Sequence, residues 1–147
     1  MHATLHTAPT VERPAFVWIG IIVELITGIA AIPVGWMLIQ DPSGKVIQIP
    51  QGWIEATPFG SYLIPGLYLM LVNGFGMLAL ALLSARRHPL APWLTGVLGV
   101  GLIIWIAVEL VALPETMVLT WVILAFGFIL GFVALFWLRR TNQLVLW

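Results

Sequence analysis

The sequence predicts an all-α integral membrane protein, folded as an antiparallel four-helix transmembrane bundle. Of its 147 residues, 61% are hydrophobic and only 8% are charged. Because soluble domains carry about 25% charged residues, this chain has too few to cover a surface that faces water. It also contains four long apolar segments, and about 20 apolar residues suffice to cross a bilayer as a helix.

The four predicted spans form a single transmembrane domain over residues 1–147, and they cover residues 16–39, 62–84, 90–113 and 117–138. Two connections, 85–89 and 114–116, are short, so the second, third and fourth spans are expected to be antiparallel neighbours. Orientation follows from the basic residues, which are enriched on the cytoplasmic side of membranes. Lys45 falls on the outer side, and both termini are expected on the cytoplasmic side together with Arg13, Arg86, Arg87, Arg139 and Arg140.

The connection 40–61, called the outer connection below, is the one sizeable segment expected outside the membrane. Its residues 41–44, Asp-Pro-Ser-Gly, have the pattern of a β-turn. The flanking segments 36–40 and 45–49 are therefore expected to pair as a short hairpin.

Further along the outer connection, Trp53 and Phe59 are expected to lie on the membrane surface. Pro65 and Gly66 should kink the second span or delay its start, because proline disrupts a helix interior. The outer connection is then either a lid over the outer mouth of the bundle or a cap that only closes helix ends.

Small residues mark the faces on which the helices are expected to pack, because close backbone approach favours helix association in lipid. Gly28 belongs to a stripe of small and polar residues on the first span, and Gly99 lies on the third. Gly127 and Gly131 form a GxxxG pair on the fourth span. That pair serves either packing within the bundle or a homodimer.

Glu24 in the first span and Glu109 in the third are the acidic side chains expected within the membrane. Charged groups there are costly and usually face the bundle interior. A rise of about 1.5 Å per residue places Glu24 roughly 12 Å from the inner end of its span and Glu109 roughly 28 Å. The resulting separation of about 16 Å argues against a paired acid and base.

Glu24 is expected near the depth of Asn73, which lies roughly 16 Å from the inner end of the second span. With no cation in any span, Glu24 should be largely neutral and hydrogen-bonded to Asn73. The alternative is a role for Glu24 in carrying a proton or binding a ligand.

Glu109 is expected near the outer surface, at the depth of Tyr68 and Trp105 and of hydroxyl groups such as those of Thr57 and Ser61. There it either binds a polar or cationic head group, acts as a general acid, or anchors the outer connection by hydrogen bonds to its backbone. Glu109 is therefore the candidate catalytic residue.

Several classes of function are excluded by what the sequence lacks. The chain contains no cysteine, which removes disulfides, thiolate metal sites and thiol redox chemistry. The net charge is zero and no basic motif occurs, so nucleic-acid binding is not expected. No metal-ligand cluster, nucleophile triad or nucleotide-binding loop is recognisable, and the sequence indicates no particular cofactor.

Several short motifs resemble one group of proteins. The segments DPSG (41–44), TPF (57–59) and SYLIPGLYL (61–69), with a glutamate in the first and third spans, are similar to short bacterial four-span membrane proteins. The resemblance covers most of the outer connection, the second span and part of the third. It implies a four-span protein of the bacterial cytoplasmic membrane, and it implies no activity.

Three functions remain open from the sequence. The first is a non-catalytic protein, either a subunit or assembly partner of a membrane complex or homo-oligomer, or a binder of a lipophilic ligand. The second is an enzyme for an isoprenoid or quinone, with Glu109 as acid or base and a pocket lined by Tyr68, Asn73 and Trp105. The third is a proton-coupled transporter that uses Glu24, Asn73 and Glu109 as steps across the membrane.

Overall fold

The computed structural model describes residues 14–55, 57–112 and 117–141, and every regular element in this part of the chain is helical. Four helical segments are long and apolar enough to cross a membrane. They are α1 (Ala15–Gln40), the continuous segment Leu63–Ala85, α5 (Ala91–Ala112) and α6 (Val118–Arg140). These bounds agree with the predicted spans to within two residues. The predicted connection 114–116 and Arg13 lie outside the described residues.

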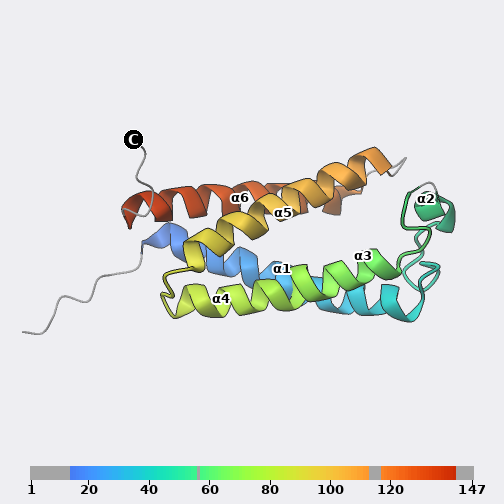
Figure 1. Ribbon diagram of the computed structural model, residues 1–147, viewed down its shortest axis with the longest axis horizontal. Coiled ribbons are helices and arrows are strands. Elements are labelled where there is room, and N and C mark those ends of the chain that lie inside the picture. The colour runs from blue at the N-terminus through green and yellow to red at the C-terminus, as the bar shows by residue number, and fades with distance from the viewer. Residues whose placement is uncertain (1–13, 56, 113–116, 142–147) are drawn as a thin grey trace, which may run out of the picture.

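The helices are arranged as two pairs, and Figure 1 shows α5 and α6 lying above the others. In the lower pair, α1 packs along the second span, which consists of α3 (Leu63–Tyr68), η1 (Leu69–Gly76) and α4 (Met77–Ala85). The start of α1, the turn between α4 and α5, and the end of α6 lie at one end of the molecule. The short helix α2 (Gln51–Glu55) lies at the other end.

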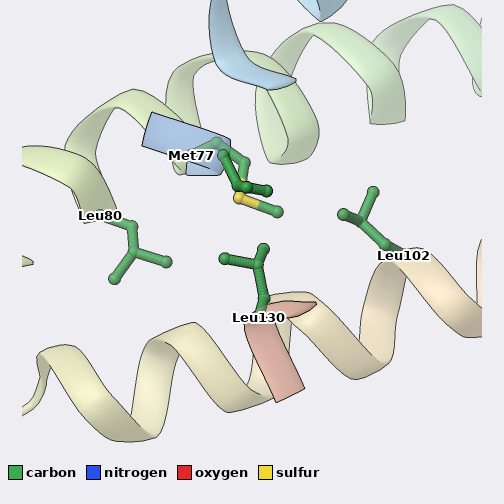
Figure 2. Packing of buried hydrophobic residues seen from close by; sticks show 5 residues of the cluster. Met77, Leu80, Leu102 and Leu130 are labelled. Atoms are coloured by element: carbon green, nitrogen blue, oxygen red, sulfur yellow. The ribbon is translucent and has the colours of Figure 1, made fainter. Parts of the chain in front are cut away.

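The core lies where all four spans meet. One buried cluster takes a residue from α1, two from α4, and one each from α5 and α6: Val23, Met77, Leu80, Leu102 and Leu130. Figure 2 shows the labelled side chains of this cluster converging from the two layers. Large apolar side chains also cover the outward faces, where Val111 is 90% exposed. Such faces are expected for helices whose surroundings are as apolar as their interior.

The second span is irregular in a place that the sequence did not indicate. Pro65 sits in the first turn of α3, where its missing N–H leaves no hydrogen bond unmade, so the helix begins normally at Leu63. The irregular stretch lies further along, over η1, which is π-helical. Gly66 permits a close crossing instead, because a Cβ on Gly66 would lie 3.0 Å from the carbonyl oxygen of Gly35 in α1.

The predicted hairpin in the outer connection is wrong, because α1 continues as helix through Gln40. The turn after it is held by the carboxylate of Asp41, which accepts hydrogen bonds from the Ser43 hydroxyl at 2.6 Å and the Val46 N–H at 3.0 Å. These hydrogen bonds lower the pKa of Asp41, the one from Ser43 most strongly. The outer connection is therefore a series of turns followed by α2.

Candidate functional site

A cavity of about 220 Å³ lies between the two helix pairs, at the end of the bundle that carries α2. Side chains of α1, α3 and η1 line one side, side chains of α5 and α6 line the other, and the outer connection contributes the rest. Most of the lining is aliphatic. Four aromatic residues also line it, Trp53, Phe59, Tyr62 and Trp105, so Trp53 and Phe59 face a cavity and do not simply lie on the membrane surface.

Polar side chains in the described lining are few. Glu109 is half-buried, and its Oε1 accepts a hydrogen bond of 2.8 Å from the hydroxyl of Thr120, in the first turn of α6. Thr120 is only 3% exposed, so packing holds this donor in place. The bond runs to α6, and the described residues show none from Glu109 to the backbone of the outer connection. Anchoring of the outer connection, one of the three roles considered for Glu109, therefore has no hydrogen bond behind it in this part of the chain.

The outer connection is held by its own hydrogen bonds and by one from Tyr62, the residue that follows it. The hydroxyl of Tyr62 donates to the carbonyl oxygen of Pro50 at 3.0 Å, and the hydroxyl of Thr57 donates to that of Ile54 at 2.7 Å. Ile54 and Tyr62 are buried together with Leu38 of α1 in a second apolar cluster. Burial raises the pKa of Tyr62 above its ordinary value. The connection thus forms a fixed cover over one side of the cavity.

Of the residues expected beside Glu109, only some line the cavity. Trp105 and Thr57 do, whereas Tyr68, Ser61 and Asn73 do not. Tyr68 lies against Trp105, with ring centroids 4.7 Å apart and an angle of 12° between the ring planes. The stacked Tyr68 ring therefore orients Trp105, and neither Tyr68 nor Asn73 belongs to the lining of this cavity.

Glu24 belongs to a separate polar cluster and does not line the cavity. It is 1% exposed, and its Oε1 accepts hydrogen bonds from the hydroxyls of Thr95 at 2.9 Å and Ser84 at 3.4 Å. The predicted bond between Glu24 and Asn73 is therefore wrong. The depth estimate assumed that all spans end at one level, and the long Glu24 side chain instead reaches residues near the α4–α5 turn. Its Oε2 and the hydroxyl of Thr27 are buried without a hydrogen-bond partner in the described structure.

The hydroxyl partners of the Glu24 and Glu109 carboxyl groups were not predicted from the sequence. Thr120, Thr95 and Ser84 are all buried within apolar spans. A hydroxyl group within an apolar helix can form a hydrogen bond with a polar group on a neighbouring helix. Each of these three residues therefore indicated a possible partner for a buried carboxyl group. Matching Thr120 with Glu109 by depth would have found one pair, since both lie near the outer ends of adjacent helices.

The glycines expected in helix packing have unequal surroundings. A Cβ on Gly28 would lie 3.0 Å from the carbonyl oxygen of Gly74, so α1 and η1 approach closely there. Gly99 and Gly127 face each other between α5 and α6, whereas a Cβ on Gly131 would meet nothing within 4 Å. Of the two alternatives for the GxxxG pair, Gly127 thus serves packing within the chain.

Comparison with known proteins adds no relative: no family model, no curated protein and no solved structure matches this chain. Within residues 14–55, 57–112 and 117–141, no group of three His, Asp or Glu side chains could hold a metal ion. The fold therefore identifies the chain only as a helical protein with four segments able to span a membrane. The cavity is the feature from which a function can be inferred.

Proposed function

We propose that this chain is a non-catalytic, multi-pass protein of the bacterial cytoplasmic membrane that binds a lipophilic ligand in the cavity beside Glu109. The observation that carries the proposal is the cavity of about 220 Å³, mostly apolar, with one hydrogen-bonded carboxyl group in its lining. Binding sites for small molecules typically combine an apolar lining with a few placed polar groups. An apolar cavity of about 150 Å³ is large enough to bind benzene. This cavity therefore has room for a larger ring or for the head of an amphiphile.

The proposed topology is an antiparallel bundle with both termini in the cytoplasm. The described arginines support it, because Arg86 and Arg87 follow α4 and Arg139 and Arg140 end α6, at the end of the molecule where these elements meet (Figure 1). Lys45 lies in the outer connection. Basic residues favour the cytoplasmic side. The cavity would then lie in the outer half of the membrane.

A second candidate function is an enzyme for a lipid-soluble substrate such as an isoprenoid or a quinone. The presence of Glu109 in the cavity favours it, because a general acid must lie within hydrogen-bond reach of the reacting group. Glu109 is the only acidic or basic side chain among the described lining residues. Binding is better supported than catalysis, because the other possible acid of the described lining, the phenol of Tyr62, already donates its proton in a hydrogen bond to the carbonyl oxygen of Pro50. The third function considered, a proton-coupled transporter, is less well supported, because Glu24 and Asn73, two of its three expected steps, do not line the cavity.

The test is native mass spectrometry of the full chain, purified from its own membrane in mild detergent. Ile123→Trp and Val108→Trp place a large ring at two positions of the lining. Val111→Trp is the matched control, because Val111 follows Val108 on the same helix and is 90% exposed. Circular dichroism on each variant checks that the bundle still folds.

The proposal predicts a bound small molecule on the wild type and on Val111→Trp, and its loss from both cavity variants. A wild type without any bound small molecule would contradict it. A larger mass that contains other polypeptides would instead identify the chain as a subunit of a membrane complex, which is the other non-catalytic function that we consider.

A further inference from the structure

We propose that the ligand carries a cationic head, of the alkylammonium or quaternary ammonium type, which lies between the carboxyl group of Glu109 and the aromatic rings of the cavity. This inference rests on the proposed function, because it names the chemical class of the ligand for the same cavity. It is carried by the charge of the lining, by the hydrogen-bonding state of its hydroxyl groups, and by its aromatic content.

The charge of the lining excludes an anion. Among the described lining residues there is no Lys, Arg or His, and Glu109 is the only acidic side chain. An anionic head placed there would be removed from water without a counter-charge, which is strongly unfavourable. A cationic head would instead be paired with the carboxyl group of Glu109.

The hydroxyl groups of the lining are already committed as donors. Those of Thr57 and Tyr62 donate to backbone carbonyl oxygens of the outer connection, and that of Thr120 donates to Glu109. Among the described side chains that line the cavity, the indole N–H groups of Trp53 and Trp105 are the only other donors. The carboxyl group, of which one oxygen is used by Thr120, is the strong acceptor of the cavity, so the lining is suited to a ligand that brings positive charge.

The aromatic rings supply the second part of a cation site. Trp53 and Phe59 lie in the outer connection, Tyr62 directly precedes α3, and Trp105 lies on α5. Cations are attracted to the faces of such rings, and clusters of them recognise quaternary ammonium groups. The stack on Tyr68 holds the plane of Trp105, so that this ring is oriented before a ligand arrives.

The experiment compares two probes of the same shape: benzyltrimethylammonium, and neopentylbenzene, in which a carbon atom replaces the charged nitrogen. Binding to the full chain in lipid nanodiscs is measured by titration calorimetry, with empty nanodiscs as the blank. The test variant is Glu109→Gln. Glu55→Gln is the matched control, because Glu55 is an exposed residue of α2 that does not line the cavity. The cavity variants Ile123→Trp and Val108→Trp show whether each probe binds in the cavity.

We expect the cation to bind the wild type at least about tenfold more tightly than its neutral counterpart, because the carboxyl group and the rings both attract it. Glu109→Gln should remove most of that difference, and Glu55→Gln should leave it unchanged. Equal affinity of the two probes, or a cation affinity that Glu109→Gln does not change, would overturn the cationic head. If the neutral probe still bound and was lost in the cavity variants, the proposed function would stand without it. Failure of both probes to bind the wild type would contradict both proposals.

Discussion

The two glycines of the GxxxG motif in α6 should respond in opposite ways to the same substitution. A Cβ on Gly127 would lie 2.8 Å from the Cγ1 of Ile103 and 3.0 Å from the carbonyl oxygen of Gly99. A Cβ on Gly131 would meet nothing within 4 Å. We therefore predict that Gly127→Ala destabilises the bundle, whereas Gly131→Ala leaves its stability unchanged or slightly higher.

The magnitude follows from the contacts at Gly127. Carbon atoms pack best at about 3.5–4.0 Å, so α5 and α6 must separate by several tenths of an ångström to accept a methyl group. Ile103 cannot easily turn away, because a β-branched side chain in a helix has essentially one rotamer. Overpacking of this kind typically costs about 1–3 kcal/mol. Replacing glycine by alanine within a helix gains up to about 1 kcal/mol, which offsets part of the loss at Gly127 and acts alone at Gly131.

The assay is thermal unfolding of both variants in the same detergent, followed by circular dichroism at a helix band. For a chain of this size, a loss of 1 kcal/mol lowers the melting temperature by about 2–4 °C. Gly127→Ala should therefore melt at least about 2–4 °C below Gly131→Ala, which itself should melt at or above the wild type. Equal melting temperatures for the two variants, or a lower one for Gly131→Ala, would refute the packing described for α5 and α6.

Three further predictions concern other contacts. Tyr68→Leu removes the aromatic stack on Trp105 and should lower the free energy of unfolding by about 0.5–1.5 kcal/mol beyond the effect of the buried surface that is lost. Tyr68→Phe keeps the stack and should lower it little. Denaturant titration of the two variants measures the difference. Glu24→Leu leaves the buried hydroxyl of Thr95 without its acceptor and should lower the free energy of unfolding by about 1–3 kcal/mol. Glu24→Gln keeps an acceptor oxygen and should lower it less. Similar losses for both variants would contradict the hydrogen bond between Thr95 and Glu24. Because the folded-state pKa of Asp41 lies below the ordinary 3.8, its carboxylate stabilises the turn above pH 3.8, and that stability is lost as the pH falls through the lower folded value. The amide of Val46 should lose hydrogen-exchange protection over that pH range in the wild type but not in Asp41→Asn.

The positions of the four long apolar helical segments could be predicted because a single physical requirement determines them. A helix that crosses the hydrocarbon core needs about 20 apolar residues, and four segments of this chain meet that condition. The ends of the spans were also predictable to within two residues, since charged residues, proline and glycine bound each apolar run. The absence of the expected hairpin could not be predicted. The pattern at residues 41–44 indicates a turn, but it does not indicate whether a helix or a strand precedes that turn.

The site was less predictable, because it depends on how the spans are placed relative to one another. Glu109 and Trp105 lie one helical turn apart, so sequence alone could place them together, and both line the cavity. Glu24 was assigned the wrong partner, since estimates of depth assume that helices end level and are regular. The second span is π-helical over Leu69–Gly76, and this changes which of its residues face α1. No pattern of residues in the sequence indicated the π-helix. Packing therefore decided between Asn73 and the hydroxyl groups that actually contact Glu24.

The most direct test of the proposed ligand site is an experimental density map of the full chain in nanodiscs made from the lipids of its own membrane. We expect non-protein density in the cavity between Glu109 and the aromatic residues of the outer connection, in contact with the ring of Trp105. A map in which side chains close that space, with no density beside Glu109, would contradict it.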